Sequence, residues 1–457
     1  MNKAKDVKHT RYILDGLHPR LLLVLYLLIS SLPLVLAYLQ NKPLREFPNE
    51  FASAFGLIGF TWMLMSFLLS GRFRTISGKI GIDKTMRLHQ VMAIVLTGFI
   101  LLHPYLYTLP MNEDLPWDPT HQLYLTLPLS AFITGMFAWV LLPVFVALAL
   151  FRDQLPYRYE SWRGLHGLAA LVLVAASLHH VLVAGRYSED LMMKLFWFGL
   201  IAIASLTLIR TYLILPMLQK KRLYNVVSVI PAALKTWHVM VEANKKKSSD
   251  FTFKAGQFAW LKLQKDPFNL TEHPFSISSA PSDLPQIRFT IKESGDFTRE
   301  IGTITDGQHA YLDGPHGYFI IDDQTFDGIV MLAGGIGVAP MMSIIRQMAH
   351  DKDNRPVKLL YGNRIESQIA FKDELKEAAS NINLDVDYVL SDPPQGWQGS
   401  TGYLDEAVIK AALVMPNPEK WLYLLCGPPV MLDSAVETLQ SAGIPKQQII
   451  FEKFSYL

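Results

Sequence analysis

Four histidines in the apolar first half of the chain have a residue type and a spacing that suit metal chemistry. His89 and His103 lie on one apolar segment and His166 and His180 on another, and the members of each pair are fourteen residues apart. At 3.6 residues per turn this spacing nearly completes four helical turns, so each pair falls on one helix face, about 21 Å apart. Imidazole is an axial ligand of haem iron. Two such helices facing each other would offer two stacked bis-histidine haem sites, which together form an electron path across a membrane.

The histidines also have a simpler interpretation, because a histidine in a membrane helix can be a hydrogen-bonded packing residue. Ionisable groups at that depth are costly and are functional candidates by default, and two pairs with equal spacing favour ligation. His179 stands beside His180, and either could be the ligand. Ideal helix phase favours His180, because a step of thirteen residues from His166 turns to nearly the opposite face. A π-bulge would reverse that preference.

Six apolar segments in the first half are each close to the ~20 residues that cross a bilayer. They cover residues 21–39, 51–70, 86–106, 123–150, 163–184 and 194–217. The first follows a basic N-terminus, but it is long and lacks a convincing small-residue cleavage site, so we interpret it as an anchor rather than a signal peptide. The sequence therefore predicts a six-helix transmembrane bundle.

Lysine and arginine are concentrated in alternate connections between these segments. The N-terminus, the connections after the second and fourth segments and the stretch after the sixth are basic, whereas residues 104–122 contain no Lys or Arg. The positive-inside rule then places both termini in the cytoplasm of a multi-pass protein of the cell (inner) membrane. His89 and His166 would lie near the inner surface, and His103 and His180 near the outer surface.

Two arginines near the ends of the apolar segments have two interpretations each. Arg186 follows His180 and could contact a haem propionate or an incoming oxidant, while Arg210 lies in the sixth segment and could pair with a propionate. Both could instead be boundary residues whose charged ends reach the membrane surface.

The composition excludes several kinds of protein and redox centre. A net charge of +2 on 457 residues, with no basic stripe of interleaved aromatics, argues against nucleic-acid binding. The single cysteine, Cys426, excludes an intramolecular disulfide and an all-cysteine iron–sulfur cluster, which needs four thiolates. Any electron relay in this chain must use other carriers.

After Leu218, short β-rich runs alternate with turn residues up to about residue 325, which predicts a small antiparallel barrel. It contains EHPFSISSAP (272–281), which would present an aromatic, a hydroxyl and a base at one strand edge. IKESGDFT (291–298) and DGPHGYF (313–319) follow. Gly295 with nearby backbone donors can approach a pyrophosphate. Each motif alone is a modest signal, because serine-rich turns are common.

From about residue 328 the pattern changes to strand, glycine turn and helix. GIVMLAGGIGVAPMMSIIRQM predicts a buried strand, a tight turn at Gly334, Gly335 and Gly337, and a helix whose N-terminus favours a phosphate. It differs from the common G-x-G-x-x-G pattern, and glycines before a helix often form only a turn. Two further strands, VKLLYGNR and WLYLLCGPPVM, end at Arg364 and at the segment Cys426–Pro428. Ligands of open parallel sheets bind at the carboxyl ends of strands, where all three motifs fall.

These motifs, in this order behind two histidine pairs, resemble the NADPH oxidase / ferric reductase family. HPFSISS, GGIGVAP and CGPP carry the resemblance, which covers nearly the whole chain. Because EF-hand loops are absent and the chain is short, it looks like a prokaryotic-type member. The resemblance implies a multidomain membrane protein. Its expected parts are a six-helix transmembrane bundle with two b-type haems (1–220), an antiparallel β-barrel FAD domain (221–325) and an α/β nucleotide-binding NADPH domain (326–457).

The resemblance also implies roles for individual residues. Phe275 would stack near the flavin, Ser276 would lie by its N5 atom, and His273 would contact the flavin nucleotide's phosphates. Cys426 and Gly427 would lie by the nicotinamide, and Phe454, or alternatively Tyr456, would be the aromatic that covers the isoalloxazine. The implied catalytic residues are Ser276, Cys426 and Phe454. The implied cofactor-binding residues are His273, Pro274, Phe275, Ser276, Ser278, Lys292, Gly295, Phe297, Thr298, Gly334, Gly335, Gly337, Pro340, Arg364, Cys426, Gly427, Pro428 and Phe454.

Two of these residues keep alternatives. Arg364 could hold the 2′-phosphate of NADPH through bidentate bonds, which favours NADPH over NADH, or it could be a surface arginine at a strand end. Cys426 is better interpreted as a small buried residue beside the nicotinamide than as a redox-active thiol.

The expected activity is transfer of electrons from cytoplasmic NADPH through FAD and two haems to an extracytoplasmic acceptor. Nicotinamide gives up two electrons together and each haem accepts one, and flavin is a carrier that can do both. Oxygen giving superoxide is favoured by the resemblance alone, and the alternatives are a ferric chelate, a quinone or a partner protein. A transporter is disfavoured, since the nucleotide motifs would lack a purpose. If the histidines bind nothing, the chain would be a flavoenzyme with a structural membrane anchor.

Overall fold

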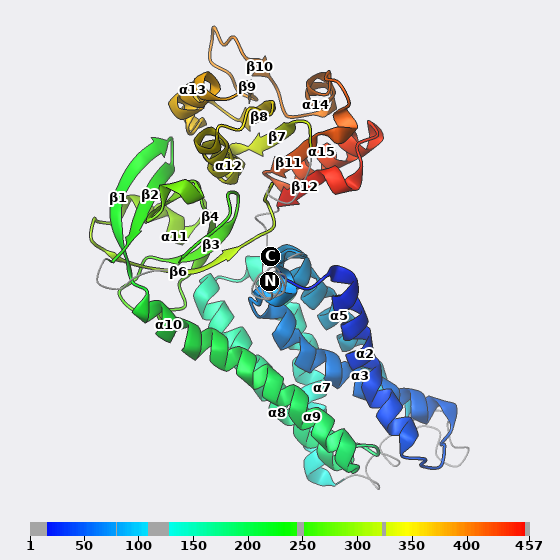
Figure 1. The fold of residues 1–457 in the computed structure, drawn as a ribbon. Coiled ribbons are helices and arrows are strands. Elements are labelled where there is room, and N and C mark those ends of the chain that lie inside the picture. Colours follow the sequence, from blue (N-terminus) through cyan, green and yellow to red (C-terminus); the bar gives the residue numbers. More distant parts are fainter. Residues whose placement is uncertain (1–15, 79, 108–127, 245–250, 322–325, 453–457) are drawn as a thin grey trace, which may run out of the picture. The chain divides into compact units, whose positions relative to one another are not determined.

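The computed structural model describes residues 16–78, 80–107, 128–244, 251–321 and 326–452 (Figure 1). The chain divides into two compact units, Met1–Ile214 and Leu215–Leu457.

Long apolar helices make up the first unit. They are α2 (Pro19–Leu39), α3 (Phe47–Ser70), α5 (Ile82–Leu106), α7 (Leu129–Leu150), α8 (Tyr159–Ala184) and α9 (Leu191–Ile209). A π-helical turn, Arg210–Ile214, continues α9 into α10 (Leu215–Lys221), and the short elements α4 (Arg74–Ser77) and η1 (Arg152–Gln154) lie in connections. Among the described residues, six helices are long and apolar enough to cross a membrane, which makes this a multi-pass membrane protein.

The predicted apolar segments are confirmed, and five of the six helices begin two to four residues earlier than their apolar stretches. The exception is α7, which begins at Leu129, whereas its segment was predicted from residue 123; residues 123–127 lie outside the described residues. The added first turns contain polar residues that a hydropathy pattern leaves out, such as Glu50 in α3 and Glu160 in α8. The start of α9 is fixed by Asp190, whose carboxylate accepts hydrogen bonds from the backbone amides of Met192 and Met193.

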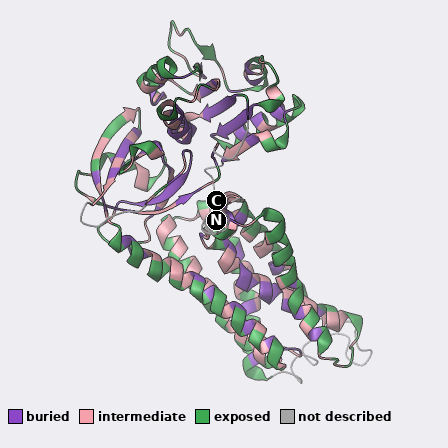
Figure 2. Ribbon diagram, viewed as in Figure 1, coloured by how far each residue is buried: buried purple, intermediate pink, exposed green. Residues whose placement is uncertain are grey.

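The interior of the helical unit is centred on α3 (Figure 2). Phe60 of α3 is 2% exposed and packs against the fully buried Trp197 of α9, with ring centroids 5.0 Å apart. Large apolar side chains on the outward faces of the other helices are exposed. Apolar residues on both the inner and outer faces are the pattern of helices surrounded by lipid.

The second unit begins with an antiparallel sheet. Its strands are β1 (Tyr224–Ala233), β2 (Thr236–Ala243), β3 (Phe258–Lys262), β4 (His273–Ser276), β5 (Gln286–Lys292) and β6 (His309–His316). Their order is β4-β3-β6-β1-β2-β5, and every neighbouring pair whose register is given is antiparallel. The side chains of Val239, Leu261 and Phe289 are completely buried in the core of this domain.

A parallel sheet follows in the same unit. Its strands are β7 (Ile329–Gly334), β8 (Val357–Asn363), β9 (Leu384–Leu390), β10 (Ser400–Thr401), β11 (Leu422–Cys426) and β12 (Ile449–Glu452), in the order β10-β9-β8-β7-β11-β12. Its main helices are α12 (Val338–Asp351), α13 (Lys372–Asn381), α14 (Glu406–Ala412) and α15 (Pro429–Ser441). Separate apolar cores lie against α12 and α13 and against α14 and α15. The strand order reverses between β7 and β11, and ligands of such sheets bind at this point.

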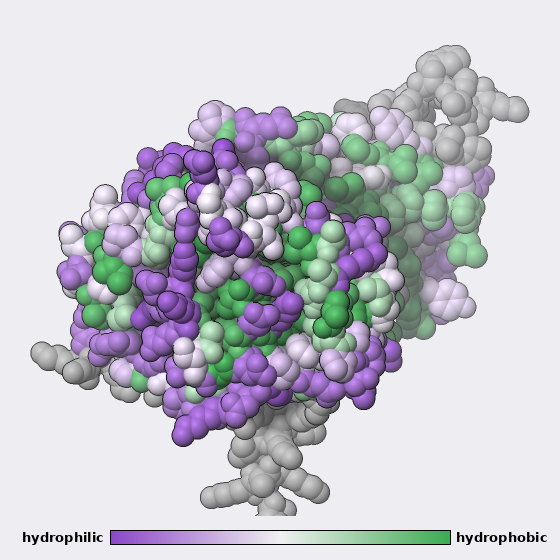
Figure 3. All heavy atoms as spheres, turned by 90° about the horizontal axis from the view of Figure 1, so that it is seen from above, coloured by the Kyte–Doolittle hydropathy of each residue, from purple (hydrophilic) through white to green (hydrophobic). Residues whose placement is uncertain are grey.

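The predicted fold class is confirmed for the polypeptide, which has six apolar helices, then an antiparallel domain and a parallel α/β domain. The two haems stay a prediction. Figure 3 shows both kinds of surface: on the nearer face hydrophilic residues surround a more hydrophobic central area, and hydrophobic residues predominate on the coloured part that lies farther back. The domain limits at residues 220 and 325 remain predictions.

Candidate functional site

The first candidate site is a pair of imidazoles carried by α5 and α8. His103 Nδ1 lies 2.7 Å from the carbonyl oxygen of Ala52, and His180 Nδ1 lies 2.9 Å from that of Ala131. When Nδ1–H donates to a carbonyl, Nε2 is left as the electron-pair donor, which is the usual state of a metal-binding histidine. The two histidines are near enough to interact electrostatically. The pair therefore fits an axial ligand set.

Two glycines on neighbouring helices make room for these rings. A Cβ built on Gly56 of α3 would lie 2.9 Å from His103 Cε1, and one built on Gly135 of α7 would lie 2.4 Å from His180 Nδ1. A larger residue at either position would displace the imidazole. The sequence pattern gave no reason to single out these glycines, because the contact joins helices far apart in the chain.

The second pair lies on the same two helices. His166 is within electrostatic range of His89 and stacks on Phe145 and Trp162, with ring centroids 4.4 and 4.9 Å away. No group of three or more His, Cys, Asp or Glu within the described residues could hold a metal ion. Each pair could thus hold iron where a porphyrin supplies the four equatorial nitrogens, which fits haem.

The structure favours His180 over His179 as the ligand. α8 is α-helical from Tyr159 to Ala184, without the π-bulge that would bring His179 into phase. His179 is exposed, and its Nδ1 lies 3.0 Å from the hydroxyl of Thr134.

Both arginines near the span ends retain a buried nitrogen that lacks a hydrogen-bond partner among the described residues. Arg186 donates from Nη2 to the carbonyl of Pro43 at 2.7 Å, while its Nε is buried and unsatisfied. Arg210 lies over the ring of Phe73 at 4.8 Å, and its Nη1 is buried and unsatisfied. Each guanidinium can therefore still donate to an anion.

A polar network that the sequence did not reveal lies next to His103. Tyr107 meets the His103 ring edge-on at 5.2 Å, and its hydroxyl lies 2.9 Å from that of Ser53. Arg45 pairs with Glu50 at 3.0 Å, and the hydroxyl of Tyr187 donates to the same carboxylate. These residues come from three separate stretches of chain, so only the folded bundle brings them together.

An aromatic cluster occupies the flavin-side motif of the antiparallel domain. The His273 ring lies 4.3 Å from that of Phe297, and Phe275 stacks on Phe297 at 6.2 Å. Pro274 stands between His273 and Phe275 in the sequence and pairs with Trp260 of β3. The hydroxyl of Ser276 is buried and has no hydrogen-bond partner within the described part of the chain. A buried, unsatisfied hydroxyl beside aromatic rings fits a bound flavin.

The turn at Gly295 is closed by Thr298. The Thr298 hydroxyl accepts hydrogen bonds from the backbone amides of Ser294 and Gly295, at 2.8 and 2.9 Å. These two amides are therefore already used within the turn, which spans the short helix α11 (Asp296–Arg299).

Ser278, also expected to bind cofactor, is completely buried. Its hydroxyl donates to the carbonyl of Arg288 at 3.1 Å and lies 2.8 Å from that of Thr290. The structure thus places the hydroxyl of Ser278 inside a hydrogen-bond network of the protein, and its role in cofactor binding stays a prediction.

The glycine turn and the Cys426–Pro428 segment meet at the point where the strand order reverses. β7 and β11 pair so that Ala333 lies beside Cys426. A Cβ on Gly337 would lie 2.0 Å from the Cys426 carbonyl oxygen, and one on Gly334 would lie 2.7 Å from Pro428 Cδ. Glycine is required here for close approach of the two loops. Pro340 lies in the first turn of α12, where a missing amide proton costs nothing.

Two side chains outside the glycine turn reach this edge of the sheet. The Lys292 ammonium of β5 would be 3.9 Å from a Cβ on Gly335, so a cation from the antiparallel domain approaches the turn. Asn363, at the end of β8, has a buried side-chain amide that interacts with the hydroxyl of Tyr361. Asn363 was missed because a lone Asn at a strand end carries no signal by itself.

Arg364 is exposed and pairs with a carboxylate. Its Nη2 lies 3.7 Å from Asp392, and the backbone amide of Asp392 donates to the Arg364 carbonyl at 2.8 Å. Any phosphate that binds Arg364 must therefore approach a negative charge as well.

Cys426 is completely buried, and burial, with a smaller contribution from Glu452, raises the pKa of its thiol well above the ordinary value. Glu452 lies directly beside it in the pairing of β11 and β12. Glu452 could not be singled out from the sequence, because strand pairing brings it beside Cys426, which lies 26 residues earlier in the chain. Phe454 and Tyr456 lie outside the described residues.

Comparisons with known proteins find several that are similar to part of this chain. The propane 2-monooxygenase reductase component of Mycolicibacterium goodii is 30% identical over 212 residues, which are 45% of this chain and 60% of that protein. NADH-cytochrome b5 reductase 1 of Cryptococcus neoformans var. neoformans is 35% identical over 164 residues, 34% of this chain and 55% of that protein. The matches therefore span only a little over half the length of these relatives. A solved structure, the cytochrome P450 reductase GcoB of Amycolatopsis, is 22% identical with a TM-score of 0.45, over 51% of this chain and 69% of that one.

Three protein families match the chain in succession. Residues 55–177 match the ferric reductase like transmembrane component, residues 224–321 an FAD-binding domain, and residues 331–437 an oxidoreductase NAD-binding domain. These domains identify an oxidoreductase with an FAD-binding domain, an NAD-binding domain and a ferric reductase-like transmembrane domain. Taken in this order, the three matches make up the domain architecture of the NADPH oxidase / ferric reductase family.

Proposed function

We propose that the chain transfers electrons from cytoplasmic NADPH, through FAD and two b-type haems, to an acceptor on the far side of the cell (inner) membrane. The observation that supports this most strongly is the histidine geometry. Two imidazoles at each of two levels of α5 and α8 lie within electrostatic range of each other, and at one level both Nδ1 atoms face backbone carbonyls. One pair would hold the inner haem and the other the outer haem.

In the soluble unit, His273, Phe275 and Ser276 would hold the flavin. FAD supplies the conversion between the two-electron chemistry of nicotinamide and the one-electron chemistry of haem. The aromatic rings would pack on the flavin, and the buried Ser276 hydroxyl would satisfy its hydrogen-bonding capacity there. Phe297 and the turn closed by Thr298 would border the flavin nucleotide's phosphates.

At the edge of the parallel sheet, the turn at Gly334–Gly337 would hold the nucleotide's pyrophosphate, with the Lys292 ammonium nearby. Cys426 and Gly427 would border the nicotinamide. Arg364 would hold the 2′-phosphate, and Asp392 would weaken that interaction. Phe454 remains the proposed aromatic that covers the flavin.

The proposed acceptor is molecular oxygen, and the support for it is the family resemblance alone. One NADPH releases two electrons and one proton, so two O₂ molecules would give two superoxide anions. A ferric chelate is the second candidate, and a specific observation favours it. Lys42 donates to the carbonyl of Arg186 but also pairs with Glu189 at 3.3 Å, so the cation beyond His180 that could bind an anionic chelate is Arg186, which retains an unsatisfied nitrogen.

The test is an anaerobic visible spectrum of the purified full chain with FAD, before and after NADPH. Bands of a low-spin b-type haem that sharpen on addition of NADPH would support the whole path. Bleaching of the flavin with no haem band would contradict the proposed haem sites and leave a flavoenzyme with a membrane anchor. Adding air or ferric citrate to separate reduced samples, and comparing the reoxidation rates, would then choose between the two acceptors.

A further inference from the structure

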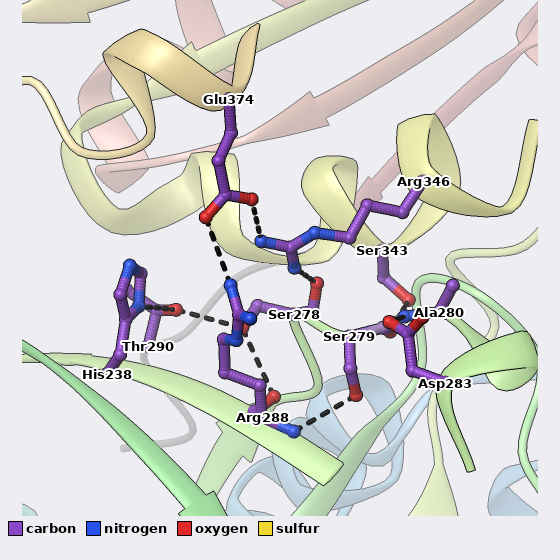
Figure 4. Close-up of polar contacts among 10 residues, drawn as sticks. All are labelled: His238, Ser278, Ser279, Ala280, Asp283, Arg288, Thr290, Ser343, Arg346 and Glu374. Carbon is purple, nitrogen blue, oxygen red and sulfur yellow. Dashed lines mark hydrogen bonds and ion pairs between the residues drawn. The ribbon is translucent and has the colours of Figure 1, made fainter. Parts of the chain in front are cut away.

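A half-buried polar cluster joins the antiparallel domain to the parallel domain within the second unit (Figure 4). Its central group is the carboxylate of Glu374 on α13. This carboxylate pairs with Arg288 of β5 at 3.0 Å and with Arg346 of α12. One acidic side chain therefore holds arginines from both domains, and we call these three residues the interdomain clamp.

The two arginines of the clamp keep the carboxyl group of Glu374 ionised. Burial alone would raise the pKa of Glu374, but Arg346 and Arg288 together hold it below its ordinary value. Burial, with a smaller contribution from Arg288, lowers the pKa of the neighbouring His238 to about 4, so this imidazole is neutral at pH 7. Breaking one partner of such a cluster leaves an unpaired, half-buried charge.

The clamp continues into backbone contacts with the flavin-side segment. Arg346 also donates to the carbonyl of Ser278, and Ser343, one turn earlier on α12, donates to the carbonyl of Ser279 at 2.6 Å. The Ser279 hydroxyl in turn accepts from the Arg288 amide at 3.0 Å. Helix α12 thus holds two consecutive carbonyls that lie directly after Ser276 and Ile277.

The other end of α12 is the proposed nucleotide site. The helix begins at Val338, immediately after the turn at Gly335–Gly337 that packs against Cys426. An α-helix is stiff over this length, so its two ends move together. Helix α12 therefore connects the turn that would hold the pyrophosphate to the segment that follows Ser276.

We propose that Arg346, Glu374 and Arg288 are positioning residues, which fix the nucleotide site against the flavin site at the distance that hydride transfer requires. The inference rests on the proposed function. Hydride transfer moves two electrons and one proton from the nicotinamide to the flavin, and its rate depends steeply on the separation of the two. A misplacement of about 1 Å can cost about 100-fold in rate.

The variants Arg346→Ala and Glu374→Gln test the proposal in the full chain. The readout is the limiting rate of flavin reduction by NADPH in anaerobic stopped flow. We expect a fall of about tenfold or more for Arg346→Ala, with the half-saturating NADPH concentration and the FAD content close to those of the wild type. Arg346→Lys should recover the rate in part, because lysine keeps the charge but lacks the fork that reaches both Glu374 and Ser278. Glu366→Gln is the matched control, since Glu366 pairs only with Lys372 within the parallel domain among the contacts described.

A second readout does not depend on activity. Spin labels at Glu300→Cys and Glu437→Cys, exposed residues of the two domains, report the interdomain distance distribution, while the buried Cys426 stays unlabelled. We expect a narrow distribution that broadens in Arg346→Ala and not in Glu366→Gln.

An unchanged distribution, or a limiting rate within about twofold of the wild type, would overturn the proposal. A wild-type flavin that neither NADPH nor NADH reduces would overturn the proposed function, and the hydride-transfer role with it. The distance distribution would still respond to Arg346→Ala in that case, so the two failures are distinguishable.

Discussion

At the scale of single residues, Gly56 and Gly135 leave the space that the rings of His103 and His180 occupy. We expect Gly135→Ala to lower the haem content to about half, because a new methyl group would overlap the ring of His180. That ring would have to rotate away from Ala131 and could no longer keep Nε2 in place. Haem content measured by the pyridine haemochrome method checks this.

The matched controls are Gly98→Ala in α5 and Gly167→Ala in α8. Nothing lies within 4 Å of a Cβ at either position, and alanine is a better helix former than glycine. Full haem content in Gly135→Ala, or equal loss in the controls, would contradict the steric argument.

The single thiol allows a residue-scale prediction based on its pKa. Because burial raises the pKa of Cys426, the thiol stays protonated at pH 8, and the thiolate is the reactive form. We therefore expect alkylation by iodoacetamide to be at least about 100-fold slower in the native protein than in urea. Mass spectrometry over a time course measures both rates. Rapid native labelling would show that the segment opens or that the thiol is activated.

At the scale of elements, the loops after β8 and β9 set the charge around Arg364. We expect Asp392→Asn to lower KM for NADPH by up to about fivefold and to leave KM for NADH nearly unchanged, because only NADPH brings a 2′-phosphate near that carboxylate. The limit follows from the exposure of the pair, since an exposed ion pair contributes at most about 1 kcal/mol. Glu377→Gln, which removes an exposed carboxylate of α13, is the control. Parallel changes for both nucleotides would place the 2′-phosphate elsewhere.

The elements were largely predictable, because their signals are local. The six apolar stretches, the strands rich in β-branched residues and the glycine turn before α12 each depend on neighbours in the sequence. The fourteen-residue spacing also put His103 and His180 on defined helix faces. What the sequence could not provide were contacts across the fold, such as Ala52 with His103. The same holds for Glu452 beside Cys426, and for the use of Ser278 within the protein.

At the scale of the whole molecule, the proposed path makes the two histidine pairs unequal. We expect His180→Ala to lose the outer haem and the reduction of the acceptor, while NADPH still reduces the flavin and the inner haem. His166→Ala should lose the inner haem, so that NADPH reduces the flavin alone and the outer haem is reduced only by dithionite.

The order of the carriers is what these variants test, since each haem can accept electrons only from its neighbour on the path. Anaerobic spectra taken after NADPH and again after dithionite measure the reduced fraction of each centre. His179→Ala is the control. The exposed His179 ring lies within hydrogen-bond distance of the Thr134 hydroxyl, so its removal should leave both haems in place. Reduction of the remaining haem by NADPH in His166→Ala would show that the flavin reaches the pair formed by His103 and His180 directly. The orientation inferred from the basic connections would then be reversed.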